Sequence, residues 1–106
     1  MFEIAILELT GKSGAIYNFE VFSNRLKFKQ VAAVYAVTKL DRQGNHAPIY
    51  VGGTNNLEDN FIFHRKQTCF VKKGATHICV HLDSTGESRK AKEADLLAAY
   101  DWPCND

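Results

Sequence analysis

Two tyrosines, a histidine and a glutamate are the side chains of this sequence best suited to acid–base or metal chemistry. Tyr35 lies in the apolar run 31–38, VAAVYAVT, and Tyr50 lies in the shorter run PIYV, which stops at two glycines. A tyrosine hydroxyl donates and accepts hydrogen bonds, but a free one titrates near pH ~10 and is a poor base at neutral pH. Either tyrosine could equally be an ordinary strand aromatic in a core, so this pair alone assigns no function.

A histidine and an asparagine share one face of a predicted helix. Leu57, Phe61 and His64 recur at helical spacing, which predicts a helix over about 55–66. Asn60 falls on the same face, one turn before His64, so both polar side chains should point toward the interior or a cleft. A hydrogen-bonded histidine and asparagine at the edge of the core is the simpler interpretation of this face.

A glutamate lies within the apolar stripe of a second predicted helix. The segment 88–100 is rich in strong helix formers, and Glu93 shares its stripe with Leu96 and Tyr100. The carboxylate could pair with Arg89 one turn earlier, although base before acid is the weaker helical order. It could instead bind a hard divalent cation such as Mg²⁺.

The rest of the chain predicts an α+β fold in which a sheet positions these residues. We expect a small, mainly antiparallel sheet with helices packed on it, and an N-terminal hairpin that extends or flanks the sheet. The strands are expected at 2–9, 15–22, 31–38, 48–52 and 76–82, with a short one at 28–29. The run 31–38 is apolar enough for a strand buried on both faces.

Length and composition indicate one ordinary globular domain, 1–106. Hydrophobic residues make up 45% of the 106 residues and charged residues 24%, a balance that excludes disordered and fibrous proteins. A net charge of +1 gives no global argument for binding nucleic acid or membranes. Any polyanion must therefore bind to a local patch.

The termini and the cysteines predict a cytoplasmic protein without a membrane partner. No apolar run approaches the ~18 residues of a membrane span, and the first residues lack the basic region of a signal peptide. Cys69, Cys79 and Cys104 are odd in number and have no Cys-x-x-Cys spacing. Without a secretion signal, we expect all three to be reduced thiols.

Two further groups of residues could bind ligands. His77, Cys79 and His81 alternate along one strand face, with Cys69 upstream, so a zinc site is an alternative by residue type, although the spacing matches no standard pattern. The candidate nucleic-acid-binding residues form short basic runs: Arg65, Lys66, Lys72, Lys73, Arg89 and Lys90. They would track phosphates if they share a surface, and would otherwise be a solvated face.

The order of these features resembles the GIY-YIG nuclease family. The resemblance covers 31–106, while 1–30 resembles the hairpin extension of a subgroup of small bacterial members. The matching elements, in chain order, are Ala33-Val34-Tyr35, Tyr50-Val51-Gly52, the helix start GGTNNL followed by His64, a later helix with Glu93, and Asn105 in WPCN. The first of these has Ala33 for the usual glycine, a change that a strand tolerates.

The resemblance implies a reaction and a role for each matched residue. It implies hydrolysis of phosphodiesters in nucleic acid, foremost DNA. Because the sequence contains no base-reading motif, we expect little sequence specificity. Tyr35 and Tyr50 would face the scissile phosphate, and one would help to deprotonate the attacking water. Glu93 would bind one Mg²⁺ or Mn²⁺ ion, His64 would contact the phosphate region, and Asn105 would support the site.

The sequence departs from the family at one functional position. The family has an arginine ten residues after the second tyrosine, and Asn60 stands there in this chain. Phosphodiester cleavage builds negative charge on the phosphoryl oxygens, which a charged fork of donors stabilises and a neutral amide does not. Arg65 would lie ~140° around the predicted helix and is therefore not expected to replace the missing arginine. Arg89, on the same face as Glu93, is a conceivable substitute.

Two functions remain open from the sequence. The first is a GIY-YIG-type endonuclease impaired by Asn60, in which Asn60→Arg should raise cleavage ~10²-fold or more. The second is a GIY-YIG-like fold that binds nucleic acid or a protein without catalysis.

Overall fold

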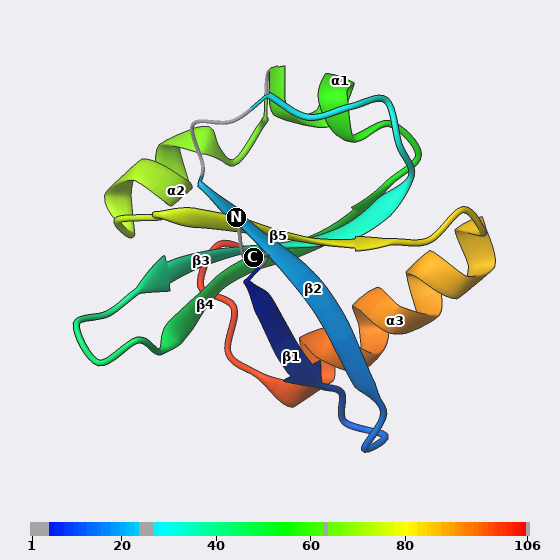
Figure 1. Ribbon diagram of the computed structural model, residues 1–106, viewed down its shortest axis with the longest axis horizontal. Coiled ribbons are helices and arrows are strands. Elements are labelled where there is room, and N and C mark those ends of the chain that lie inside the picture. Colours follow the sequence, from blue (N-terminus) through cyan, green and yellow to red (C-terminus); the bar gives the residue numbers. More distant parts are fainter. Residues whose placement is uncertain (1–4, 24–26, 63, 106) are drawn as a thin grey trace.

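The computed structural model describes residues 5–23, 27–62 and 64–105 of the chain (Figure 1). Its fold is α+β, with five antiparallel strands in a curled sheet of order β1-β2-β5-β3-β4 and three helices. The strands are β1 Ile6–Thr10, β2 Ile16–Ser23, β3 Ala33–Leu40, β4 His46–Thr54 and β5 His77–Leu82. The helices are α1 Leu57–Ile62, α2 Gln67–Lys72 and α3 Gly86–Ala99.

The predicted sheet is confirmed in its main features. The N-terminal hairpin β1–β2 extends the sheet by pairing with β5. Strand β3 lies between β5 and β4, and its first six residues are buried, as the apolar run predicted. Residues 2–4 of the first predicted strand lie outside the described residues.

Helices cover both faces of the sheet, and each face has its own core (Figure 1). Side chains alternate along β3, so Tyr35 and Val37 point to one face while Val34 and Ala36 point to the other. Leu57 of α1 and Phe70 of α2 pack against the first face. Residues packed on the second face come from the hairpin, α3 and the segment after it, among them Phe19, Leu96 and Trp102.

Strand β4 is an edge strand, which explains why a proline fits inside it. Pro48 has no N–H to donate. In an edge strand the backbone N–H groups on the outer side have no neighbouring strand to pair with, so the missing donor breaks no hydrogen bond of the sheet. The pairing with β3 shifts between Val37 and Thr38, next to this proline. The strand starts at His46, two residues earlier than predicted, and runs to Thr54.

The predicted helix over 55–66 is wrong in its extent. Helix α1 ends at Ile62, and a second short helix, α2, follows from Gln67, where the sequence pattern predicted no helix. Between them the chain turns, because the backbone N–H of Lys66 donates to Nδ1 of His64 and that of Gln67 donates to the His64 carbonyl. His64 therefore belongs to a turn between two helices.

Two smaller expectations about the elements also need correction. Residues 28 and 29 form no strand. Helix α3 begins at Gly86, two residues earlier than predicted, after a bend in which Asp83 accepts hydrogen bonds from the Thr85 N–H and the Ser88 hydroxyl. Within the described ranges, no helix is long and apolar enough to cross a membrane.

The expectation of three reduced thiols is wrong. Cys69 of α2 and Cys104 of the C-terminal segment form a disulfide, and Cys79 is the free, buried cysteine. The sequence hid this pair, because the two residues are 35 positions apart and only the fold brings them together. Since disulfides are typical of oxidising compartments, the cysteines no longer support the predicted cytoplasmic location.

Candidate active-site cleft

A cleft of about 550 Å³ lies where β3 and β4 meet α1 and α3. Tyr35, Tyr50, Asn60, His64 and Glu93 all line it, although they come from four elements and a turn. The other lining residues are Gly52, Gly53, Thr54, Asn55, Asn56, Asp59 and Arg65. The residues that the sequence singled out as catalytic candidates thus share one cleft, with the exception of Asn105.

The two tyrosines lie on the same face of the sheet. Their ring centroids are 5.9 Å apart in a stacked arrangement. Tyr35 is only 2% exposed, and burial, reinforced by the neighbouring Tyr50, raises its pKa well above the usual range of a phenol. Tyr35 is therefore protonated at neutral pH.

His64 forms a buried hydrogen bond to Tyr35, 2.8 Å from Nε2 to the hydroxyl oxygen. Its Nδ1 accepts the N–H of Lys66, so in the neutral ring the proton is on Nε2 and is donated to Tyr35. Burial, with a further contribution from the positive charge of Arg65, lowers the pKa of His64. Tyr35 consequently accepts from His64 and keeps its own hydroxyl proton for another acceptor.

Aromatic rings hold His64 in place. The rings of Tyr50, Phe61 and Phe70 lie 5.2, 5.4 and 4.7 Å from the imidazole, centroid to centroid. Phe70 belongs to α2, a helix that the sequence pattern did not predict. The second short helix thus helps to fix the orientation of the imidazole and, through it, of the Tyr35 hydroxyl.

Two consecutive glycines at the end of β4 allow the close approach of a hydroxyl and a carboxylate. A Cβ at Gly52 would lie 2.7 Å from the Tyr35 hydroxyl oxygen, closer than real side chains permit. A Cβ at Gly53 would lie 3.3 Å from an oxygen of Glu93, a tight contact. Consecutive strand residues face opposite ways, so Tyr35 approaches this edge strand from the α1 side and Glu93 from the α3 side.

Glu93 is a half-buried carboxylate at the rim of the cleft. Burial raises its pKa, which means that the site disfavours the negative charge as it stands. A bound divalent cation would remove that penalty, and one carboxylate completed by waters and a phosphate suits Mg²⁺. No group of three or more potential metal ligands of the His, Cys, Asp and Glu types occurs in the part of the chain that the structure describes, so Glu93 alone would bind a metal weakly.

Asn60 carries a buried amide nitrogen with no hydrogen-bond partner among the described residues. The Asn60 amide lies close enough to Tyr35 to lower the pKa of its hydroxyl, an effect opposite to that of burial. The amide nitrogen nevertheless makes no hydrogen bond of standard geometry to the Tyr35 hydroxyl. An unpaired donor of this kind is costly in a folded protein. Because the nitrogen is buried, an acceptor in the cleft could reach it only after a small rearrangement of the side chain.

Asn105 supports the site from outside the cleft. Its amide nitrogen donates to the carbonyl of Val51 at 2.8 Å, and its amide oxygen accepts the Val51 N–H at 2.9 Å. The backbone N–H of Cys104 also donates to Ile49. These bonds occupy the open side of the edge strand on either side of Tyr50, as a further strand would.

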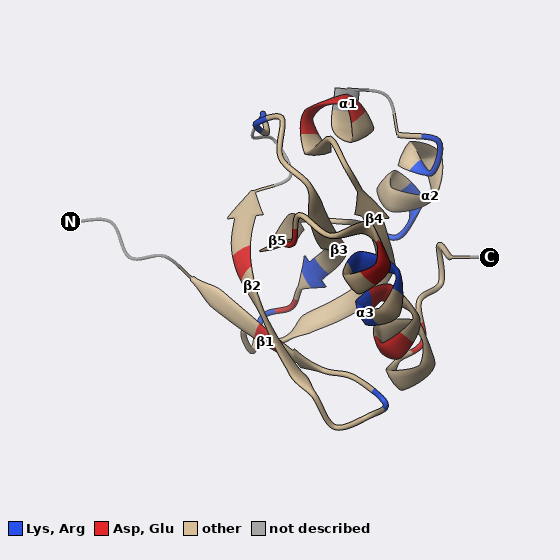
Figure 2. Cartoon of the chain, turned by 90° about the vertical axis from the view of Figure 1, so that its right-hand side faces the viewer, with Lys and Arg blue, Asp and Glu red and all other residues tan. Residues whose placement is uncertain are grey.

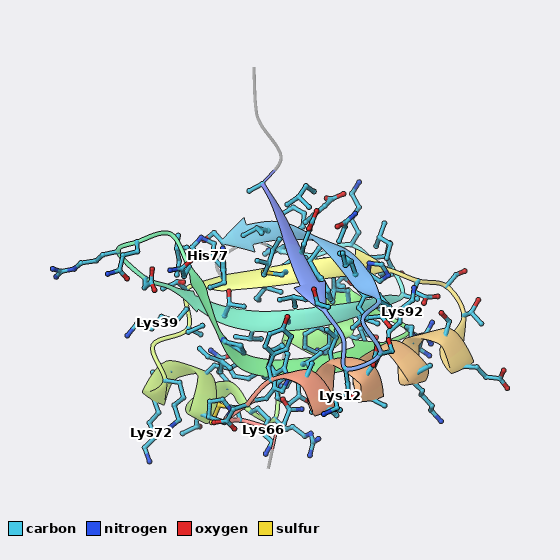
Figure 3. The ribbon with its side chains drawn as sticks, turned by 90° about the horizontal axis from the view of Figure 1, so that it is seen from below. Lys12, Lys39, Lys66, Lys72, His77 and Lys92 are labelled. Atoms are coloured by element: carbon cyan, nitrogen blue, oxygen red, sulfur yellow. A yellow bond between two sulfur atoms is a disulfide. The ribbon has the colours of Figure 1, made fainter. Side chains whose placement is uncertain are left out.

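The candidate basic residues lie around the cleft at different distances. Arg65 lines the cleft itself, and Arg89 and Lys90 line a smaller adjoining cavity of about 210 Å³ with Gly53 and Glu93. The remaining three, Lys66, Lys72 and Lys73, belong to α2 and its flanks. Figure 2 shows basic positions on α2 and α3 and acidic ones on α1, and Figure 3 shows Lys72 pointing away from the sheet.

The residues of the zinc alternative have other partners. His81 donates from Nδ1 to the carbonyl of Asn18 and accepts the Lys92 ammonium at Nε2. The side chain of His77 is hydrogen-bonded to that of Thr76. Cys79 is buried, and burial raises the pKa of its thiol to about 11, which disfavours the thiolate that zinc requires.

Two charged residues of the cleft were not recognised as such from the sequence. Asp59 was overlooked, because it lies next to Asn60 and adjacent helical residues normally point in different directions. Arg65 was assigned to another helix face because the predicted helix was too long. The signal that could have placed both is the segment 52–56, GGTNN, which ends β4 and leads into the short helix α1 at the cleft.

Comparison with known proteins adds no relative. The chain matches no protein-family model, no curated protein and no solved structure.

Proposed function

We propose that this protein is a GIY-YIG-type endonuclease that hydrolyses nucleic-acid phosphodiesters, foremost in DNA, with one divalent metal ion. The observation that carries the proposal is the convergence of Tyr35, Tyr50, His64 and Glu93 on one cleft, in the order and spacing that the family resemblance requires. The α+β sheet with its N-terminal hairpin is compatible with that family.

The hydrogen bonds of the cleft suggest different roles for the two tyrosines. Tyr35 is protonated and accepts from His64, so its hydroxyl donates to a phosphoryl oxygen or orients the attacking water. Tyr50 is then the tyrosine that helps to remove a proton from that water. His64 remains neutral and keeps the Tyr35 proton directed into the cleft.

Glu93 would hold the metal, because it is the half-buried carboxylate whose approach to the cleft depends on Gly53. When bound, Mg²⁺ or Mn²⁺ would offset negative charge on the leaving oxygen. Asn105 would keep the edge strand, and with it Tyr50 and the glycines, in register.

A second candidate is a binding module that has lost catalysis. It is favoured by Asn60, since this position holds an arginine in the family and a neutral amide cannot supply the same charge. Such a module would still bind nucleic acid or a protein through the same cleft.

A cleavage assay separates the two functions. Branched, single-stranded and duplex DNA would be incubated with the protein in Mn²⁺, with chelator as the control. The nuclease proposal predicts metal-dependent cuts in at least one of these forms. Binding of DNA without any cut, by a folded protein that binds Mn²⁺, would favour the binding module.

A further inference from the structure

We infer that Arg65 supplies the positive charge that Asn60 lacks and that it is the phosphate-binding arginine of this cleft. The inference rests on the proposed nuclease function and names the group that would stabilise the scissile phosphate. It reverses the expectation from the sequence, which placed Arg65 on another face of a long helix.

The path of the chain brings Arg65 to the cleft. Helix α1 ends at Ile62, so residues 60 and 65 do not lie on one continuous helix and the helical angle between them does not apply. The chain instead turns at 64–66, and Arg65 lines the same cleft as Asn60 and Glu93. The arginine thus reaches the site from a turn.

The turn that carries Arg65 is fixed by His64, which is itself a catalytic candidate. His64 bonds to Tyr35 through Nε2 and to the backbone of Lys66 through Nδ1, so one imidazole ties both ends of the turn around Arg65 to the cleft. The charge of Arg65 is near enough to lower the pKa of His64. Arg65 therefore lines the cleft in which a phosphate bound by Tyr35 and His64 would lie.

The charged residues that line the cleft also favour Arg65 as the phosphate-binding group. Among the described residues that line the cleft, Asp59 and Glu93 are negative and Arg65 is the one basic side chain of permanent charge. A phosphodiester entering between two carboxylates needs a cation besides the metal. The buried, unpaired amide nitrogen of Asn60 can add a neutral donor but no charge.

Arg89, the other candidate, is already engaged. Its guanidinium donates to the carbonyl of Asp83 at 3.0 Å and lies near Gly86, at the start of α3. It lines the adjoining cavity and is not among the residues that line the main cleft. Its place fits a contact with a neighbouring phosphate better than one with the scissile phosphate.

The test is a set of four proteins assayed under single-turnover conditions with Mn²⁺: wild type, Arg65→Ala, Asn60→Arg, and the double variant. We expect Arg65→Ala to lose ~10²-fold or more in the cleavage rate. Asn60→Arg should gain little in the wild type, where a charge is already present. In the Arg65→Ala background the same substitution should restore most of the loss, since it returns an arginine to the same cleft.

Controls separate charge from folding. Arg42→Ala removes an exposed arginine from the β3–β4 turn, at the opposite end of these strands from Gly52 and Gly53, and should leave the rate unchanged. Arg65→Lys should recover only part of the rate, because lysine lacks the planar fork. Binding of uncut DNA in Ca²⁺ should weaken only a few-fold in Arg65→Ala, since one phosphate contact is a small share of the affinity.

The inference and the proposed function fail in different ways. If Arg65→Ala cleaves at the wild-type rate, or if Arg89→Ala alone loses the activity, the inference is overturned while the nuclease stands. If wild type is inert and Asn60→Arg is active, the inference about Arg65 is likewise overturned, while the nuclease function of the cleft stands. If all four proteins are folded, bind Mn²⁺ and DNA, and cut nothing, both are overturned.

Discussion

At the scale of single residues, the fold shifts the pKa values of three groups in the site away from their values in water. Tyr35 stays protonated, His64 stays neutral, and Glu93 carries a charge that its surroundings disfavour. In each case the largest cause of the shift in pKa is burial of the group. Changing one of these residues should therefore alter both the activity of the site and the free energy of unfolding, and a change that lowers the activity can raise the stability.

Glu93→Gln should abolish Mn²⁺ binding and leave the fold intact. Because burial raises the pKa of this carboxylate, its charge destabilises the folded state above that pKa, and the neutral glutamine removes the penalty. The gain in the free energy of unfolding should be at most ~1 kcal/mol, since the group is half exposed and water screens it.

Calorimetric titration with Mn²⁺ and chemical unfolding would measure the two effects. Glu87→Gln, at an exposed position in the first turn of α3, is the matched control and should change neither. Unchanged Mn²⁺ affinity in Glu93→Gln would exclude this carboxylate as the ligand.

The protein should lose stability as the pH falls below ~6.5, in part through His64. Burial lowers the pKa of folded His64, so the unfolded chain, with its ordinary value near ~6.5, binds the proton first. As the pH falls from ~6.5 toward the lower pKa of folded His64, protonation therefore favours the unfolded state more and more. Above pH ~6.5 this contribution to the stability is fully present. His46, whose pKa is also lowered by burial, contributes in the same direction.

Unfolding by urea at several pH values would show this slope. His64→Gln should reduce the slope between pH ~7 and ~5.5, and His46→Gln should reduce the remainder. A slope unaffected by His64→Gln would mean that this imidazole titrates alike in both states.

At the scale of elements, a disulfide joins helix α2 to the C-terminal segment, the two parts of the chain that pack against residues of the cleft. Helix α2 carries Phe70 against His64, and the C-terminal segment holds β4 through Asn105. The bond between Cys69 and Cys104 links them across 35 positions of sequence. Removing it frees the unfolded chain and should cost about 2–4 kcal/mol.

Replacing Cys69 and Cys104 together by serine, and unfolding the variant in urea beside the wild type, would measure this cost. Reductant should destabilise the wild type to a similar extent and should not affect the double variant, which is the control. A wild type that is indifferent to reductant would contradict the disulfide.

The sequence predicted the strands better than the helices, for a physical reason. Strand patterns are local. The apolar run around Tyr35 predicts β3 directly, and the glycines after Val51 indicate where the strand of Tyr50 ends. The break between α1 and α2 depends on a side chain, because His64 binds the backbone of Lys66 and ends the helical path. The disulfide and the clamp of Asn105 on Val51 depend on residues far apart in sequence, so no local pattern could reveal them.

At the scale of the whole molecule, any binding of DNA would have to come from a local surface, since the net charge is only +1. Lys90 lines the cavity that adjoins the cleft, whereas Lys12 lies in the β1–β2 turn (Figure 3). If Lys90 contacts a phosphate, Lys90→Ala should reduce the slope of log affinity against log salt by about one unit.

Fluorescence anisotropy over a range of salt concentrations would measure that slope. Lys12→Ala is the control and should leave it unchanged. Equal slopes for wild type and both variants would place the DNA elsewhere on the surface.

We propose that this cleft cleaves phosphodiesters with a metal ion held by Glu93. The most direct measurement is the single-turnover rate of DNA cleavage in Mn²⁺ for wild type, Glu93→Gln and Glu87→Gln, purified in parallel. We expect wild type and Glu87→Gln to cut at the same rate and Glu93→Gln not to cut detectably. Equal cleavage by all three proteins would show that the activity belongs to something other than this site, and would contradict the proposed role of Glu93.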